Sequence, residues 1–307
     1  MTDLRIIFMG TPEFAVPSLE ILVENKFNVV AVITAPDKPQ GRGQKLTYSP
    51  VKVCAMKHNI PVLQPVNLKS LEFSEQLKSY NANLQVVVAF RMLPETVWAM
   101  PAIGTFNLHA SLLPQYRGAA PINWAIMNGE KETGVTTFFL KHEIDTGSII
   151  FQEKETISEN DNVGTLYERL MHKGAQLVLR TVKAIAAGQY PSTPQPETGS
   201  HKHAPKIFKD SCNINWNLTS AQIRNFVRGL TPYPGAWTII NDKSYKISAI
   251  SSANAGNPDH KPVGTLNTDN KTYLYFRASD GWVSVDELQP EGKKIMKIEE
   301  FFRGNKI

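Results

Sequence analysis

Short apolar runs alternate with helix-like segments through the first two thirds of the chain, and this alternation limits the possible folds more than any other feature. Strands joined through helices pair in parallel, because a parallel crossover needs a dozen or more residues. The strands expected in this region are residues 4–8, 29–33, 62–63, 84–90, 104–109, 134–140 and 149–156. The pattern predicts an α/β domain with a Rossmann-like, mostly parallel sheet. A long amphipathic helix should follow, with Asp161 as its N-cap, and run to about residue 187.

The composition changes at residues 188–205, where proline and glycine accumulate and large apolar side chains are nearly absent. Such a segment is typical of a linker. Beyond it, one short helix at 219–229 and several β-type runs separated by turns predict a small β-barrel of the OB-like type. We therefore divide the chain into residues 1–189, a linker at 190–206 and a second domain at 207–307.

Several protein classes are disfavoured by what the sequence lacks. No stretch approaches the roughly 18 apolar residues of a membrane helix, and no basic leader with an apolar segment opens the chain. Cys54 and Cys212 lie far apart and match no metal-ligand spacing. We expect a cytoplasmic protein with no membrane contact, no disulfide and no metal, and we expect it to be a monomer.

The positive charge is concentrated in the C-terminal third. Residues 206–307 contain 14 Lys and Arg against 10 Asp and Glu, whereas the preceding residues contain 19 against 18. A basic domain suits a polyanionic partner such as nucleic acid. By itself, this excess of positive charge is equally typical of an ordinary solvated surface.

The most informative residues are Asn107 and His109, at the end of an expected strand. Because side chains alternate along a strand, both project from one face. Ligands of open parallel sheets bind at the carboxyl ends of the strands. An amide and an imidazole there could stabilise a developing oxyanion. On its own, an Asn-x-His pair more often indicates a core histidine whose hydrogen bonds are made within the protein.

A carboxylate, Asp145, lies in the Asp-Thr-Gly run between two later strands. A carboxylate near an imidazole orients it and favours its charged form. The run by itself is also an ordinary turn. The first turn, at residues 10–14, lacks the three-glycine dinucleotide fingerprint, which disfavours an NAD enzyme.

Together, these segments resemble the formyltetrahydrofolate-dependent formyltransferase family. The resemblance extends over nearly the whole chain and both expected domains. The segments that carry it are FMGTPEFA at 8–15, APDKPQGRG at 35–43, LTYSPVK at 46–52, NLHASLLP at 107–114, RGAAP at 117–121, IDTG at 144–147, TPYPGAW at 231–237 and LQPEGKK at 288–294. One departure is the loop at 89–94, which is one residue shorter than the usual family run and has no glycine.

The resemblance implies a Rossmann-like formyltransferase domain followed by an OB-like tRNA-binding domain. It implies transfer of the formyl group of N10-formyltetrahydrofolate to the α-amino group of methionine on initiator tRNA, without a metal. Asn107, His109 and Asp145 fall on the family's catalytic positions. Its folate contacts fall on Ser111, Leu112, Leu113 and Pro114 and on Phe90, Arg91 and Met92. Its loop for the tRNA acceptor stem falls on Lys38, Arg42 and Lys45.

Two alternatives remain compatible with these residues. A formyltransferase of the same fold could act on a nucleotide-linked aminosugar or a purine precursor, although the basic Gly-Arg-Gly loop at 41–43 disfavours this acceptor class. A protein that kept the fold and only bound RNA would have no need of the Asn107, His109 and Asp145 set.

Overall fold

The computed structural model describes residues 2–40, 45–196, 199–253 and 261–307. The chain forms two compact units, and each is described by itself. The N-terminal unit comprises Met1–Gly118, Thr133–Glu155 and Tyr167–Lys202, and the C-terminal unit comprises Ala119–Glu132, Thr156–Leu166 and His203–Ile307. The two units are defined by which residues pack together. The functional domain boundaries at residues 189 and 207 remain a prediction from the sequence.

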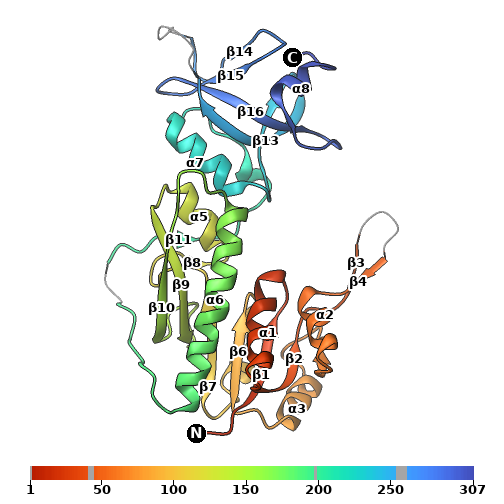
Figure 1. Cartoon of the computed structure of the whole chain (residues 1–307), viewed down its shortest axis with the longest axis vertical. Coiled ribbons are helices and arrows are strands. Elements are labelled where there is room, and N and C mark those ends of the chain that lie inside the picture. The colour runs from red at the N-terminus through yellow and green to blue at the C-terminus, as the bar shows by residue number, and fades with distance from the viewer. Residues whose placement is uncertain (1, 41–44, 197–198, 254–260) are drawn as a thin grey trace. The chain divides into compact units, whose positions relative to one another are not determined.

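A seven-stranded sheet forms the centre of the N-terminal unit (Figure 1). Its order is β10 (Ile149–Thr156), β9 (Glu132–Phe139), β7 (Gly104–His109), β6 (Leu84–Val88), β1 (Arg5–Gly10), β2 (Asn28–Ile33) and β5 (Val62–Leu63). The strands from β5 to β7 pair in parallel, and β9 runs antiparallel to β7. Every residue of the central strand β6 is buried, as its continuous apolar run predicts.

Helices cover both faces of this sheet. The elements are η1 (Glu13–Ala15), α1 (Val16–Glu24), α2 (Pro50–Lys57), α3 (Leu71–Ser79), α4 (Glu95–Trp98) and α6 (Val163–Ala186). Phe73 and Leu77 of α3 share one core cluster with strand residues such as Met9. On the opposite face, α6 comes so close to β7 that a Cβ at Gly174 would lie 2.6 Å from Leu108.

The start of α6 corrects one expectation. Asp161 was the expected N-cap, but the backbone N–H of Thr165 donates to the side chain of Asn162, at 3.0 Å. The Asp161 carboxylate instead accepts from the Ser158 N–H and the Thr165 hydroxyl. Adjacent Asp and Asn are both good capping residues, so local sequence did not distinguish them.

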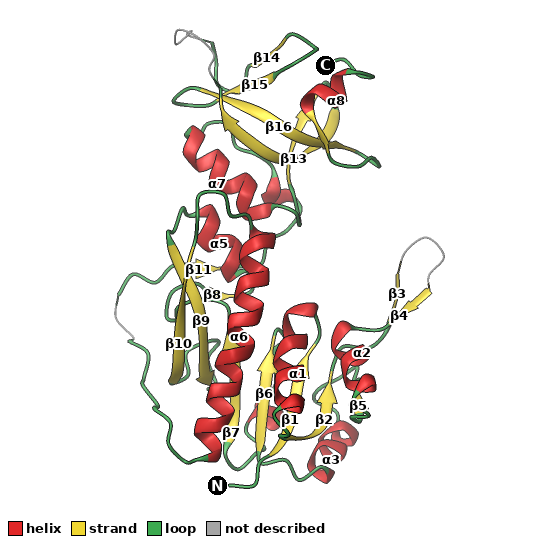
Figure 2. Cartoon of the chain, in the orientation of Figure 1, coloured by secondary structure: helices red, strands yellow, loops and turns green. Residues whose placement is uncertain are grey.

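The C-terminal unit is an antiparallel half-barrel with helices, as Figure 2 shows by its yellow strands and red helices. Its strands are β12 (Ala236–Ile240), β13 (Lys243–Ser252), β14 (Leu266–Thr268), β15 (Leu274–Arg277), β16 (Trp282–Pro290) and β17 (Met296–Lys297). Its helices are α5 (Pro121–Met127), η2 (Asp210–Cys212), α7 (Ser220–Leu230) and α8 (Ile298–Phe302). Thr219 and Gln222 form a capping box at the start of α7.

The two expected architectures are confirmed, a mostly parallel α/β sheet and a small antiparallel β domain. Two short strands, β8 (Arg117–Gly118) and β11 (His203–Ala204), were not expected, and neither was α8. β8 and β11 are two-residue strands without an apolar run and α8 is little more than one turn, so none of them carries a periodicity that the sequence would reveal. No helix in the described ranges is both long and apolar enough to cross a membrane.

Candidate active site

Asn107 and His109 lie at the carboxyl end of β7, between β6 and β9 in the sheet. His109 is buried, with 6% of its surface exposed, and Asn107 is half-buried. Within the part of the chain that the structure describes, no protein group hydrogen-bonds to the Asn107 side-chain amide. This amide is therefore available to a ligand at the sheet edge, where ligands of parallel sheets bind.

The imidazole of His109 has a defined orientation. Its Nε2 lies 2.8 Å from the backbone carbonyl of Tyr116, and its Nδ1 lies 3.8 Å from Oδ2 of Asp145. A carbonyl only accepts hydrogen bonds, so Nε2 carries a proton. The Asp145 carboxylate is placed to pair with the ring when the ring is charged. In that charged form Nδ1 also carries a proton, and at 3.8 Å from Asp145, beyond hydrogen-bond distance, this N–H can donate to another acceptor.

Asp145 is held in a tight turn. Its backbone has a left-handed conformation, with φ of 56°, and its Oδ2 accepts from the Gly118 N–H at 3.0 Å. Gly147 follows two residues later, and a Cβ there would lie 1.5 Å from the carbonyl oxygen of Phe139. Only glycine allows this turn to pack against the end of β9. The Asp-Thr-Gly run therefore fixes the position of the carboxylate.

Gln195 connects the segments that carry these groups. Its side chain is 7% exposed, and its Nε2 donates to the carbonyls of Asp145, at 2.8 Å, and Gly147, at 2.9 Å. Its Oε1 accepts from Nη2 and Nε of Arg117, at 2.7 and 3.2 Å. One buried amide thus holds both the Asp145 turn and the segment that leads to Gly118.

The expected folate-binding turn, Ser111 to Pro114, is closely packed. Ser111 is fully buried, and its hydroxyl donates to the Gln115 carbonyl at 2.6 Å. Leu113 is also buried, and its N–H donates to the Thr136 hydroxyl. Leu112 and Pro114 are half-buried. Ser111 and Leu113 would therefore shape this turn rather than present side-chain surface to a folate.

The loop after β6, which carries Phe90, Arg91 and Met92, differs in exposure from residue to residue. Met92 is 73% exposed, whereas Phe90 packs partly against the core. The Arg91 guanidinium donates to the carbonyls of Pro65 and Val66 in the segment after β5. The loop begins at Ala89, whose φ of 48° is unusual for a residue other than glycine. These contacts hold the loop at the same sheet edge as β7.

The expected tRNA loop is a two-stranded hairpin of β3 (Lys38–Gln40) and β4 (Lys45–Thr47). Lys38 is exposed, and Lys45 pairs with Gln40 in the hairpin register. Arg42 lies outside the described residues.

A polar cluster holds the base of this hairpin. Lys52 Nζ contacts the Asp37 carboxylate at 2.5 Å and Oε1 of Gln64 at 2.8 Å, and Gln64 Nε2 donates to Asp37 at 2.8 Å. The hydrogen bond from Lys52, followed by that from Gln64, lowers the pKa of Asp37. Asp37 directly precedes β3, so the cluster sets the direction in which the hairpin leaves the sheet.

The structure therefore brings His109 and Asp145 into contact distance, with Asn107 on the same strand as His109. Sequence reasoning missed Gln195 and the Lys52 cluster. Gln195 lies within the proline-rich segment assigned to a linker, and no local pattern distinguishes it. Lys52 belongs to one of the segments that resemble the formyltransferases, and this resemblance is the sequence feature that could have indicated its role.

Comparison with known proteins agrees with this geometry. The formyl transferase family model matches residues 4–182, and the model of the formyl transferase C-terminal domain matches residues 206–306. A methionyl-tRNA formyltransferase of Bacteroides fragilis is 52% identical over 308 residues, which cover 98% of this chain and 95% of that protein. The chain belongs to the methionyl-tRNA formyltransferase family. Another family member, from Flavobacterium johnsoniae, is 48% identical over 99% of this chain and 97% of its own length.

Solved structures outside the methionyl-tRNA formyltransferase family share its fold. A sugar 3N-formyl transferase, WlaRD, superposes with a TM-score of 0.66 at 24% identity, covering 96% of this chain and all of that chain. HypX of Aquifex aeolicus, solved with tetrahydrofolic acid, gives a TM-score of 0.63 at 18% identity over 99% of this chain and 48% of that chain. At these identities the likeness concerns the fold alone.

Proposed function

We propose that this chain transfers the formyl group of N10-formyltetrahydrofolate to the α-amino group of methionyl-initiator tRNA. The product would be the N-formylmethionyl-tRNA that starts translation. The observation that carries the proposal is the combination of an unengaged Asn107 amide with the His109–Asp145 pair at the carboxyl end of β7. This arrangement occurs in a chain that is 52% identical to a methionyl-tRNA formyltransferase.

The reaction needs hydrogen-bond donors for the formyl oxygen and a route for one proton from the amine to N10. The methionyl amine attacks the formyl carbon, a C–N bond forms, and negative charge grows on the formyl oxygen. The Asn107 amide and the Nδ1–H of His109 in its charged imidazolium form, with Nε2–H donating to Tyr116 and Asp145 nearby, would stabilise that charge. The bond to N10 then breaks, the amine loses a proton, and N10 gains one. Asp145 would pass this proton, through a water molecule, from the amine to N10.

Packing around the three groups supports this assignment of roles. The Tyr116 carbonyl holds Nε2 of His109, which leaves Nδ1 for the formyl oxygen. The Gly118 N–H and the buried Gln195 amide hold Asp145. Because the His109 imidazole and the Asp145 carboxylate are held in place before the substrate binds, these two groups need little reorganisation as the charge develops.

The folate would lie between the turn at Ser111–Pro114 and the loop of Phe90, Arg91 and Met92. Both segments border the sheet edge at which β6 and β7 end. The exposed Met92 and half-buried Phe90 offer apolar surface to an aromatic ring system. Arg91 would act by holding its loop, because its guanidinium already bonds to Pro65 and Val66.

The β3–β4 hairpin would bind the acceptor stem through Lys38, Arg42 and Lys45, because basic side chains pair with phosphates. The polar cluster of Asp37, Lys52 and Gln64 would orient the hairpin.

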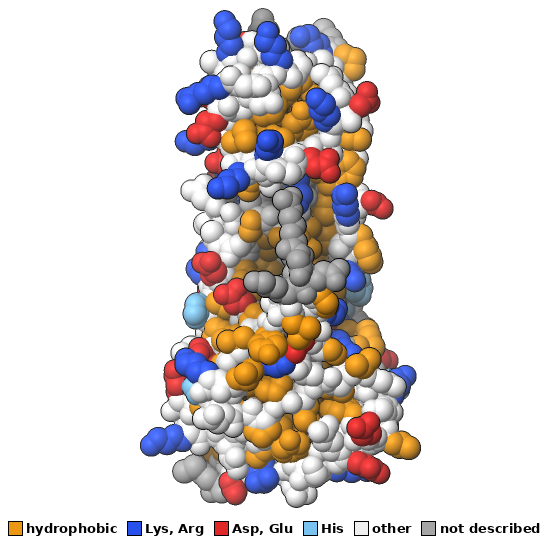
Figure 3. Space-filling view, turned by 90° about the vertical axis from the view of Figure 1, so that its right-hand side faces the viewer, with side chains coloured by type: hydrophobic (Ala, Val, Ile, Leu, Met, Phe, Trp, Pro, Cys, Tyr) orange, Lys and Arg blue, Asp and Glu red, His pale blue; other side chains and the backbone are white. Residues whose placement is uncertain are grey.

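The C-terminal unit would bind the rest of the tRNA. It contains a cleft of about 760 Å³, which three lysines line, Lys206, Lys209 and Lys246, together with Trp237 and the 79% exposed Tyr233. Cationic and aromatic side chains suit phosphates and unpaired bases respectively. Figure 3 shows Lys and Arg side chains spread over one face of this unit. We expect the enzyme to act as a monomer in the cytoplasm.

A direct assay tests this function. Purified protein is incubated with N10-formyltetrahydrofolate and charged initiator tRNA, and the released amino acid is analysed for N-formylmethionine. The wild-type chain should form it, and His109→Ala should reduce turnover by about two orders of magnitude, since one oxyanion donor of this kind contributes about 10²–10³-fold. Near-wild-type turnover of His109→Ala would contradict the proposed mechanism. Absence of product with the wild-type chain would contradict the function itself.

A further inference from the structure

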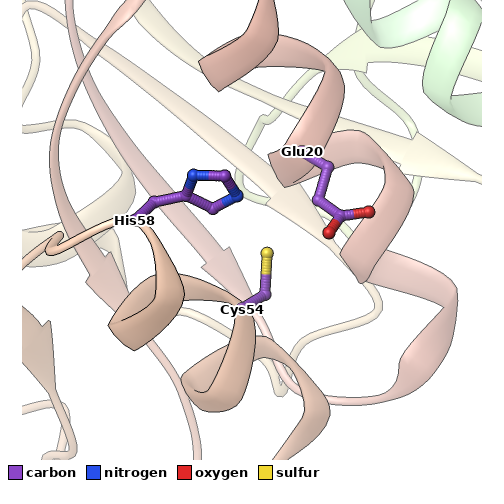
Figure 4. Close-up of side chains that lie close together, drawn as sticks. All are labelled: Glu20, Cys54 and His58. Atoms are coloured by element: carbon purple, nitrogen blue, oxygen red, sulfur yellow. The ribbon is translucent and has the colours of Figure 1, made fainter.

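Three metal-binding side chain types meet away from the candidate active site, between α1 and α2. Cys54 and His58 lie four residues apart at the end of α2, so they share one side of that helix, and Glu20 faces them from α1 (Figure 4). One ligand atom of each residue, the carboxylate oxygen, the thiol sulfur and a ring nitrogen, lies within 4.8 Å of the others. All three side chains point toward a common centre (Figure 4).

The histidine provides a second and independent indication. Nε2 of His58 is buried and has no hydrogen-bond partner among the described residues. A buried polar nitrogen without a partner destabilises the fold unless a ligand satisfies it. Figure 4 shows this side of the ring turned toward Glu20 and Cys54. The protein therefore places an unsatisfied ligand atom where two further ligand atoms converge.

The Cys54 thiol is buried beside an acidic side chain. Cys54 is 4% exposed, and burial, followed by the charge of Glu20, raises the pKa of its thiol to about 11. Without a cation, the thiol keeps its proton at neutral pH. A bound divalent cation would favour the thiolate and satisfy the histidine nitrogen as well.

We propose that Glu20, Cys54 and His58 bind one zinc ion, with water as the fourth ligand. Zinc binds sulfur, nitrogen and carboxylate oxygen ligands. Softer cations prefer sites made mainly of sulfur, and harder cations prefer sites made mainly of oxygen. Bonds of about 2.0–2.3 Å separate tetrahedral ligand atoms by about 3.3–3.8 Å. Because no two of the three ligand atoms are more than 4.8 Å apart, a contraction of at most about 1.5 Å would close the site, and the partly exposed Glu20 side chain can move toward it.

One neighbouring cation competes with zinc. Lys57 Nζ lies 3.3 Å from Oε1 of Glu20, with 68% of the lysine side chain exposed. An ion pair this exposed contributes little, so zinc can replace it. Loss of a ligand should weaken zinc binding, whereas loss of the competing lysine should strengthen it. Lys57→Met should therefore bind zinc more tightly than the wild-type chain.

The sequence-based expectation of no metal rested on the two cysteines, which match no ligand spacing with each other. The proposed set uses only Cys54, and its third ligand comes from a separate helix. Zinc bound there would connect α1 and α2, which pack against each other, and would thereby stabilise the N-terminal unit. It has no part in the formyl transfer proposed above.

Cobalt substitution in the full-length chain tests the site. Co²⁺ titration should give the visible bands of a tetrahedral complex and a thiolate-to-cobalt charge-transfer band, saturating at one ion per chain. Zinc should displace cobalt and so remove both sets of bands. In the metal-free chain, zinc binding should release about one proton per ion at neutral pH, as the thiol ionises. Cys54→Ser should lose the charge-transfer band, and His58→Gln should lose the tetrahedral bands.

Cys212→Ser is the matched control, because Cys212 is equally buried but lies in the C-terminal unit. It should retain all the cobalt bands. Zinc should also raise the thermal unfolding midpoint of the wild-type chain and of Cys212→Ser, but not of Cys54→Ser. A Co²⁺ spectrum unchanged by Cys54→Ser, or a wild-type spectrum without tetrahedral bands, would overturn the proposal. Circular dichroism of each variant separates loss of the site from loss of the fold.

Discussion

Replacing Gln195 with leucine should lower the turnover of formyl transfer far more than the affinity for either substrate. Leucine nearly conserves the side-chain volume but removes two donated hydrogen bonds and one acceptor. The lost bonds are those to the carbonyls of Asp145 and Gly147 and the two from Arg117 to Oε1. Gln195 itself would touch neither substrate, so its effect passes through the position of Asp145.

The structure sets the expected magnitude. Each carbonyl left without a partner costs about 1–3 kcal/mol when buried. The bond to Gly147 is buried and the bond to Asp145 is partly buried, so water can replace part of the second. We expect the turn to be destabilised by about 2–4 kcal/mol on this basis. A displacement of about 1 Å at a catalytic group can cost 100-fold in rate, so kcat should fall about 100-fold.

The assay measures kcat and KM for formylation of methionyl-tRNA, together with chemical unfolding. Gln195→Glu is the informative second variant, because glutamate still accepts from Arg117 but cannot donate to either carbonyl. It should lose about as much turnover as Gln195→Leu. Gln176→Leu is the control, since Gln176 is exposed on α6 in the same unit. Its kinetics should be those of the wild-type chain.

Two results would refute this reasoning. If Gln195→Glu kept near-wild-type kcat, the donated hydrogen bonds would not position Asp145. If both Gln195 variants changed KM and left kcat intact, the residue would act on substrate binding. A failure of Asp145→Asn to reduce turnover would instead contradict the catalytic role of Asp145 and leave the packing role of Gln195 intact.

Three further predictions follow from single contacts. Asn107→Ala should reduce kcat about 10²–10³-fold with little change in stability, because it removes one donor to the formyl oxygen; steady-state kinetics and thermal unfolding check this. Lys52→Met should raise KM for methionyl-tRNA more than KM for the folate, since Lys52 holds the base of the hairpin, whereas a fall in folate affinity alone would contradict that role. Gly147→Ala should give a chain that unfolds at lower temperature and has little activity, because its Cβ would meet the Phe139 carbonyl; an unchanged unfolding midpoint would refute the clash.

Much of the fold could be predicted because its signals are local. Continuous apolar runs identified β1, β2 and β6, and strand alternation placed Asn107 and His109 on one face of β7. The left-handed backbone at Asp145 and the close approach at Gly147 also agree with the Asp-Thr-Gly turn read from the sequence. These features depend on residues within a few positions of one another.

The remaining features depend on contacts between distant segments. Gln195 bonds to a turn 50 residues earlier, and only the folded chain shows that it is buried. Glu20 meets Cys54 and His58 across two helices, so no spacing rule could connect them. The N-cap of α6 was placed one residue too early for a different reason: Asp161 and Asn162 have similar capping propensity, and the local hydrogen bonds of Asp161 to Ser158 and Thr165 leave the cap to Asn162.

The most direct test of the central claim compares acceptors for the wild-type chain with N10-formyltetrahydrofolate as the donor. The measured quantity is kcat/KM for formylation of methionyl-initiator tRNA and of a nucleotide-linked aminosugar. The proposed function predicts formylation of the tRNA and kcat/KM at least a thousandfold lower for the sugar, on the order of the discrimination that a dedicated binding surface supplies. Equal or greater kcat/KM on the aminosugar would contradict it.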